Sequence, residues 1–284
     1  MAITRGKTET YVLPNGRIEF NVFPLTNGTA DKSKAKGFRY LGSCKELTLT
    51  QESEMLEHKS SECGLNKTDL EVPISSKLTG SFTSDNINGE NLALFFAGDV
   101  SNVVQQQDTG RTEVIQIFPS LGYRLGVTSQ NPNGVFAAEI TKIELFGNQA
   151  NANSGTSSTG TLVADKDYEF NSEMAYLMIG DTASTKLVPE TGVWAKVTYN
   201  LKNAKREVVI SKGQNTIGEL LFRGCNAYGE NRQYWLPKVR LSAEGDLALK
   251  GGEEFMSLGF SITALEDTAA GSMLYVNGQP TTLA

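Results

Sequence analysis

Residues 38–98 decide the fold and read FRYLGSCKELTLTQESEMLEHKSSECGLNKTDLEVPISSKLTGSFTSDNINGENLALFFAG. In 45–50, and again in 70–83, apolar residues take every second position, which is typical of strands with one buried face. Between these two runs, 51–67 carries four glutamates against two lysines. Because such a charged segment cannot form a core, we predict that it is the tip of a long hairpin that projects into solvent or reaches a partner.

A short helix is expected directly after the hairpin. Asn88 is a suitable N-cap, and Glu90 places an acid in the first turn, where it suits the helix dipole. The apolar face comes from Leu92, Leu94, Phe95 and Phe96, and Gly98 is the expected stop. About eleven residues are too few for a stable isolated helix, so this one must pack on a sheet.

Many short runs with strand character follow, and Pro237 inside one of them predicts an edge strand or a bulge. Residues 148–161 are a low-complexity polar stretch, which predicts a flexible surface loop. The expected strands are 112–118, 123–128, 135–146, 166–170, 175–179, 193–201, 207–210, 217–224, 233–241, 247–249 and 254–265.

This pattern predicts an all-β fold, a β-sandwich or barrel, with one short packed helix, a long projecting hairpin and an extended N-terminal arm. The expected division is an arm over residues 1–36 and one β domain over 37–284, although the length also permits two smaller domains.

Charge is distributed unevenly along the chain. Residues 1–36 hold six basic and three acidic residues, whereas the remainder holds 20 basic and 29 acidic residues. The segment is interpreted either as a solvated tail or as a basic arm that docks on an acidic face of a neighbouring copy. Residues 17–23 (RIEFNVF) alternate well enough to add a strand to a sheet.

The sequence offers little enzyme chemistry. Its single histidine, His58, lies in the acidic hairpin tip, and nucleophile elbows, phosphate loops and zinc-binding helices are missing. Cys44, Cys63 and Cys225 have no metal-ligand spacing, so free thiols are expected. Asp165 and Asp167 predict a turn rather than a calcium loop. We expect no catalytic, cofactor-binding or metal-binding residues, although the 32 acidic residues neither support nor exclude the carboxylate pair of a glycosidase.

Direct nucleic-acid binding and membrane insertion are both disfavoured. A net charge of −6 lacks the Lys/Arg excess on which DNA affinity rests. The sequence has neither an apolar run of membrane-spanning length nor an N-terminal signal peptide, so the protein is expected to stay in the cytosol.

Two stretches resemble the major tail tube protein of long-tailed, non-contractile bacteriophages. The first is LTLTQESEMLEHKSSECGL followed by DLEVPISSKLTGSFTSDNINGENLALFFAGD, and the second runs from Gly218 to Asp267. Together they cover about half of the chain. The matching feature is the order of predicted elements: a strand, an acidic tip, a second strand and a helix that ends in glycine.

The resemblance implies a structural virion protein that assembles in the host cytoplasm. In that family, hexameric rings stack into a hollow tail tube through which the genome leaves, and the hairpin and terminal arms bridge rings. The implied partners are identical copies, other tail proteins such as tape measure, tail tip and terminator proteins, and double-stranded DNA in transit. An acidic lumen would repel that DNA without any binding site. Carried onto this chain, the expected assembly residues are Arg5, Lys7, Arg17, Phe20, Glu52, Glu54, Glu57, His58, Glu62 and Lys67.

The alternative hypothesis is a β-sandwich that binds carbohydrate or a host surface. Trp194, Tyr234 and Trp235 would then form an aromatic platform for a sugar. The competing interpretation places all three in the core or in an interface, because each lies in a strand-like run.

Overall fold

The computed structural model describes residues 11–60, 67–181, 187–251 and 255–278. The chain is mostly β-strand, as predicted, and divides into two compact units. Unit 1 takes residues 1–101 and 208–284, and unit 2 takes residues 102–207. The β domain predicted over 37–284 therefore spans both units, and the sheets of unit 2 are built only from strands between 108 and 201.

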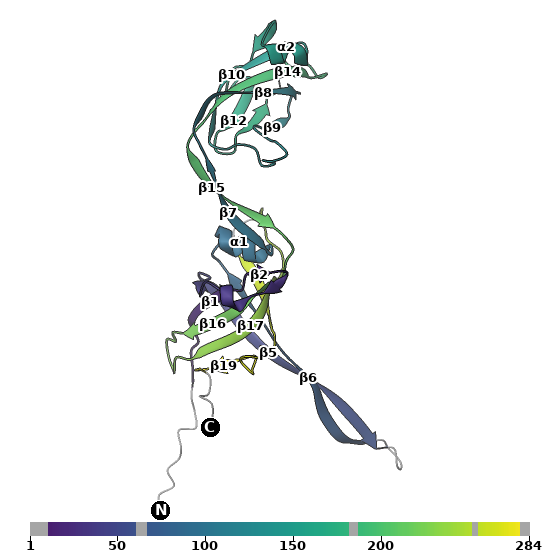
Figure 1. Ribbon diagram of the computed structural model, residues 1–284, viewed down its shortest axis with the longest axis vertical. Coiled ribbons are helices and arrows are strands. Elements are labelled where there is room, and N and C mark those ends of the chain that lie inside the picture. Colours follow the sequence, from purple (N-terminus) through teal and green to yellow (C-terminus); the bar gives the residue numbers. More distant parts are fainter. Residues whose placement is uncertain (1–10, 61–66, 182–186, 252–254, 279–284) are drawn as a thin grey trace, which may run out of the picture. The chain divides into compact units, whose positions relative to one another are not determined.

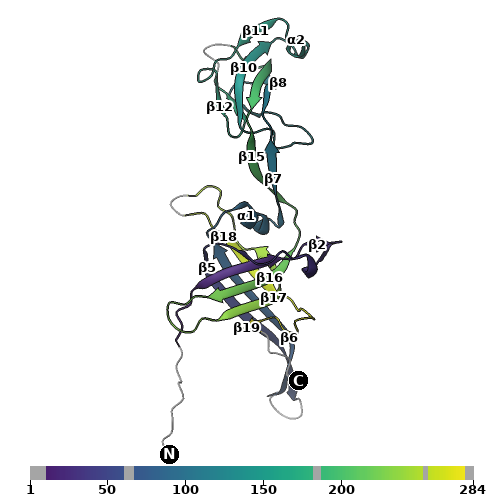
Figure 2. The same cartoon turned by 60° about the vertical axis from the view of Figure 1, so that its left-hand side comes forward.

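Unit 1 is built on one antiparallel eight-stranded sheet (Figures 1 and 2). One short strand, β19 (Tyr275–Val276), pairs with β17, as β18 does, but at a different stretch of β17. The other strands, in spatial order, are β4 (Arg39–Tyr40), β1 (Gly16–Val22), β16 (Thr216–Gly224), β17 (Gln233–Ala243), β18 (Leu258–Ala264), β6 (Lys67–Ser84) and β5 (Cys44–Ser60).

Much of the predicted N-terminal arm belongs to this sheet. β1 pairs with β16 along its whole length, and Ile18 and Phe20 are buried in the core. After β1 the chain forms a small hairpin, β2 (Leu25–Thr26) with β3 (Thr29–Ala30), and a 3-10 turn, η1 (Lys32–Lys34). Alternation in 17–23 predicted the strand correctly, but not that its partner is about 200 residues away in the same chain. Residues 1–10 lie outside the described residues.

The helix α1 (Gly89–Phe95) covers one face of the sheet of unit 1. The Asn88 side chain caps it by accepting from the Asn91 backbone N–H at 2.7 Å, as predicted. Leu94 and Phe95 join the apolar cluster of the sheet, in which Phe82 and Phe260 stack at 5.1 Å. The helix ends at Phe95, and Ala97 (φ 47°), not the expected Gly98, takes the left-handed conformation that follows it.

Unit 2 is a β-sandwich. Its four-stranded and three-stranded sheets bury one shared core that includes Ile143, Val197, Tyr199 and Leu177. The first sheet has the order β11 (Ser158–Thr161), β10 (Ala138–Phe146), β14 (Val193–Leu201) and β8 (Asp108–Ile117). The second has the order β12 (Tyr168–Asn171), β13 (Tyr176–Ile179) and β9 (Gly122–Arg124).

Residues 148–161 are not the predicted loop. They form a short helix, α2 (Gln149–Ser154), followed by β11 at the edge of the sandwich. Asn148 caps the helix by accepting from the Asn151 N–H at 2.8 Å, and Ala152 is fully buried. One small apolar residue and one cap therefore order a stretch whose composition predicts a loop.

The chain passes between the units in β7 (Gly98–Gln105) and β15 (Ala204–Ser211), which pair with each other. A side chain at Gly98 would place its Cβ 2.0 Å from the Ile210 carbonyl oxygen, so this pairing requires glycine there. β7 was not predicted from the sequence. Residues 247–249 were predicted as a strand but are irregular.

Candidate assembly site

The long hairpin continues far beyond the sheet of unit 1. β6 pairs with β18 only from Thr79 to Ser84, whereas β5 and β6 stay paired out to Ser60 and Lys67. We call residues 51–59 and 68–77 the ribbon, and every one of its side chains is exposed. The strands were therefore predicted correctly but too short, since most of the predicted tip 51–67 continues β5 (Figure 1).

Toward its tip, one face of the ribbon carries a patch of apolar side chains. Leu56 lies directly opposite Val72, and Leu70 lies two pairs further along, opposite His58. Residues opposite each other in an antiparallel pair share a face, so these three side chains adjoin. They are 60%, 43% and 57% exposed, and Ile74, the extra residue of a bulge, is 54% exposed. A two-stranded ribbon with such a face has no core of its own to bury it.

The other face of the ribbon carries negative charge. Glu57 lies opposite Glu71, and Met55 lies opposite Pro73. Like charges opposite each other destabilise a strand pair. Within the described ribbon, Lys59, 3.7 Å from Glu57, and the Thr68 hydroxyl, which donates to Glu57 at 3.4 Å, offset part of the cost. His58 Nδ1 lies 2.6 Å from Asp69 Oδ1 with both side chains exposed, as expected for a surface histidine. The arrangement suits a partner that brings positive charge.

The structure places the predicted assembly residues in different environments. Glu52 and Glu54 lie on the ribbon opposite Lys77 and Ser75, on the same face as Leu56 but nearer the sheet. Arg17 is exposed on β1, with its guanidinium 5.6 Å from the centroid of the Tyr40 ring. Phe20 was predicted at an assembly interface but lies in the core of unit 1. It is 1% exposed, because its position in β1 points to the helix-covered face. Arg5, Lys7 and Glu62 lie outside the described residues, as does the side chain of Lys67.

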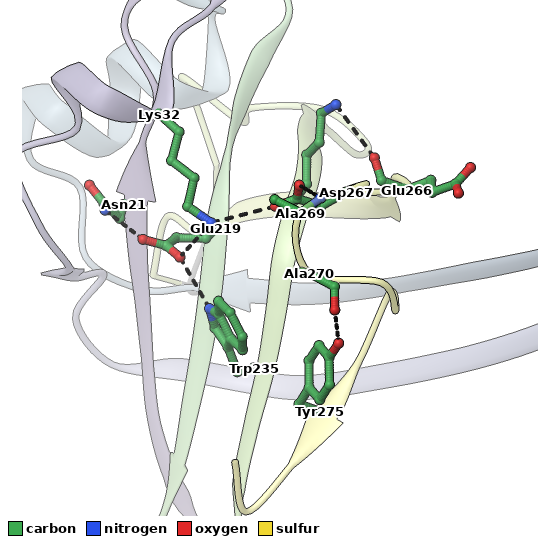
Figure 3. A network of polar contacts seen from close by, with 10 residues as sticks. Asn21, Lys32, Glu219, Trp235, Glu266, Asp267, Ala269, Ala270 and Tyr275 are labelled. Carbon is green, nitrogen blue, oxygen red and sulfur yellow. Dashed lines mark hydrogen bonds and ion pairs between the residues drawn. The ribbon is translucent and has the colours of Figure 1, made fainter. Parts of the chain in front are cut away.

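Lys32 holds the N-terminal segment on the other face of the sheet of unit 1 (Figure 3). Its ammonium group lies 3.5 Å from Asp267 and 3.9 Å from Glu219, and it sits over the rings of Phe23 and Trp235 at 5.7 and 5.6 Å. Glu219 is buried and accepts hydrogen bonds from Asn21 and from the Trp235 indole at 2.7 and 3.1 Å.

Lys32 of the predicted basic arm thus contacts acidic side chains of its own subunit, whereas the sequence predicted a neighbouring copy as the partner. Sequence reasoning identified the charge asymmetry but not these partners, which lie up to 235 residues away from Lys32.

Two of the three aromatic residues of the carbohydrate hypothesis pack against other aromatic rings. Trp235 stacks on Tyr275 at 5.5 Å, and Tyr234 lies 6.0 Å from Phe222. Trp194 belongs to unit 2, where it pairs with Phe146 of β10. These contacts explain Tyr234 and Trp235 without a ligand.

Groups with metal or redox chemistry are few in the described part of the chain. Among those residues, no group of three or more His, Cys, Asp or Glu side chains is placed to hold a metal ion. Cys44 and Cys225 are free thiols, and burial raises the pKa of Cys44, which makes it less reactive. Asp165 and Asp167 lie in a turn, as predicted, and Asp167 accepts from the Val163 N–H at 2.8 Å.

Within the described ranges, no helix has both the length and the apolar character needed to span a membrane. Over residues 25–119, the chain is similar to the family described as "Protein of unknown function UCP028589". That segment takes in β5, the ribbon, β6 and α1, together with the start of unit 2. A search of curated proteins finds no match to the chain.

Proposed function

We propose that the protein is a structural subunit of a bacteriophage tail tube. Identical copies form hexameric rings, the rings stack, and the genome passes through the resulting channel. Its role is architectural rather than catalytic and needs no cofactor, and its partners are identical copies and other tail proteins. The observation that carries the proposal is the ribbon, a long strand pair with an exposed apolar face on an otherwise well-packed sheet.

Open sheet edges also support polymerisation. In the described part of the chain, the sheet of unit 1 ends at β5 on one side and at the two-residue β4 on the other. Unpaired N–H and C=O groups along an edge attract another strand, and natural monomers normally protect such edges. A ring in which one copy's β5 meets the β4–β1 edge of the next removes both edges at once.

The ribbon supplies a second contact, suited to joining rings. Burial of its half-exposed Leu and Val side chains contributes on the order of 1 kcal/mol each, so a few of them stabilise a repeated contact appreciably. Its acidic face adds specificity, because rim charges steer association more than they strengthen it. Arg17, exposed on β1, is a residue through which a neighbouring copy would meet those carboxylates.

Replacement of residues 52–77 by an Asn-Gly turn tests the proposal. Gln51 and Leu78 are directly paired, so a two-residue turn closes the shortened hairpin without disturbing the sheet. We expect a soluble, folded subunit that forms no tubes in negative-stain micrographs. A matched control replaces only Ser53 and Ser76, which pair directly and are not predicted assembly residues, with Ala; it keeps the ribbon and should form tubes. Normal tubes from the shortened protein would refute the assembly role of the ribbon.

A further inference from the structure

Rows of hydroxyl side chains cross the sheet of unit 1 on the face opposite α1. In one row, Thr50 pairs with Thr79, which pairs with Thr263. In the next row, Thr48 pairs with Ser81, Ser81 with Ser261, and Ser261 with Ser242. We call these seven residues the hydroxyl face; it spans β5, β6, β18 and β17.

The two faces of the sheet differ in what they bury. Leu78, Phe82, Phe260 and Ile262 alternate with the hydroxyl residues and point to the other side, where they pack with α1 in the apolar cluster. Thr48 and Thr50 are exposed, and the remaining hydroxyl residues are partly exposed. Over β5, β6, β18 and β17 the sheet thus has one face closed by a helix and one polar face, and the Lys32 site lies on the polar side at the β1–β16 end of the sheet.

The hydroxyl face carries little net charge. Arg240, opposite Thr263, is the ionisable residue at the end of the first row. In the next pair toward the ribbon, Glu52 faces Lys77, so their charges oppose each other. On the other flank, Lys45 lies 2.8 Å from Asp85. The acidic excess of the composition is therefore not concentrated on this face.

We infer that the hydroxyl face is the wall of the channel and that this wall is neutral rather than acidic. The inference rests on the proposed function. If sheets join through their edges into a ring, one face of every sheet turns to the bore, and a face covered by a helix and a core cannot do so. DNA affinity comes from Lys and Arg that neutralise phosphates. Hydroxyl groups carry no charge, so rows of them offer phosphates only hydrogen bonds that water can replace. Such a wall lets a polyanion slide without holding it.

Size-selective cysteine labelling locates this face. Ser81→Cys and Ser261→Cys are nearly isosteric and sit in the middle of the sheet, and Glu90→Cys on α1 is the control for the opposite face. In tubes, N-ethylmaleimide should label all three, and a PEG-maleimide too large to enter the bore should label only Glu90→Cys. In free subunits both reagents should label all three. Peptide mass spectrometry separates these sites from the native cysteines.

Two results would overturn the inference alone: tubes in which the large reagent labels residue 81 or 261 as fast as residue 90, or tubes in which neither reagent reaches 81 or 261. If the unmodified protein forms no tubes, the proposed function fails and the inference falls with it.

Charge substitution tests the neutrality of the wall. Tubes of Ser81→Lys with Ser261→Lys should retain short double-stranded DNA on the order of tenfold more strongly than unmodified tubes at low salt, and the excess should vanish at high salt. The matched Ser81→Gln with Ser261→Gln variant adds bulk without charge and should retain no more than the unmodified protein. Equal retention by Lys and Gln variants would contradict a wall that faces DNA.

Discussion

The ribbon and strand β14 both contain alternating apolar residues, but β14 buries these residues and the ribbon exposes them. β14 has a partner on each edge and buries every second residue, from Ala195 to Leu201, in the sandwich of unit 2. In the ribbon, β5 and β6 pair only with each other, and none of their residues there is buried. The apolar side chains of Leu56 and Leu70 are therefore not buried within the subunit. β14 thus buries its apolar residues inside unit 2, whereas the ribbon leaves its apolar side chains exposed, and under the proposed function other copies cover them.

The largest expected effect comes from placing a charge in β14. Val197 is fully buried, so Val197→Asp leaves an unpaired carboxylate in the core and should lower the free energy of unfolding by more than about 4 kcal/mol. Each unit holds one of the two tryptophans, so Trp194 fluorescence in a Trp235→Phe background reports urea unfolding of unit 2. A loss below about 1 kcal/mol would mean that β14 is not the closed core strand described above.

Tyr199 in the same strand should make unit 2 sensitive to alkali. Burial, with the neighbouring Glu113 carboxylate, raises the pKa of Tyr199 to about 12 from an ordinary 10.0. Between these values the unfolded chain loses the proton and the folded chain keeps it, so the free energy of unfolding falls as pH rises, by up to about 3 kcal/mol. Below pH 10 both states are protonated and stability is unaffected.

Urea unfolding from pH 9 to 12 checks this expectation. Tyr199→Phe should flatten the alkaline decline, and Tyr176→Phe, an exposed tyrosine of the same unit, should not. An unchanged decline in Tyr199→Phe would show that another group titrates.

A smaller effect is expected where the ribbon leaves the sheet. A Cβ at Gly80 would lie 2.2 Å from the Thr48 carbonyl oxygen, so Gly80→Ala should cost about 1–3 kcal/mol through displaced backbone. Gly251→Ala in the same unit meets no atom within 4 Å and serves as the control. Trp235 fluorescence in a Trp194→Phe background follows unit 1. Equal stability of the two variants would contradict the close approach of β5 and β6.

The smallest effect on stability is expected in the ribbon itself. Leu56→Ser with Val72→Ser removes apolar groups that contact solvent, so the free energy of unfolding of the subunit should change by no more than about 0.5 kcal/mol. Tube formation, followed by light scattering, should nevertheless fall sharply. If the pair of substitutions destabilised the subunit as much as Gly80→Ala does, the ribbon would be part of the core instead.

Local signals in the sequence predicted a good part of the fold. The Asn88 cap, the strand over 193–201 and the all-β class follow from short-range chemistry, and the structure has each of them. Pro237 predicted an edge or a bulge, and the register between β16 and β17 shifts opposite it, in a central strand. These features depend on neighbouring residues, which a sequence displays directly.

Features set by distant partners were not predictable. The sequence places Phe20 in an exposed arm, because β16, the strand that pairs with β1, lies about 200 residues later. β7 has no buried alternation and becomes a strand through its pairing with β15. The Lys32 site needs Glu219, Trp235 and Asp267 from three separate segments. In the ribbon, by contrast, the acidic tip and apolar alternation were visible, because both of its strands are close in sequence.

Negative-stain microscopy of the concentrated full-length protein tests the central claim most directly. Self-assembly through the sheet edges and the ribbon predicts rings or tubes about 10 nm wide, the size expected for a ring of compact subunits of this mass. Monodisperse monomers at every concentration, with the ribbon intact, would contradict it.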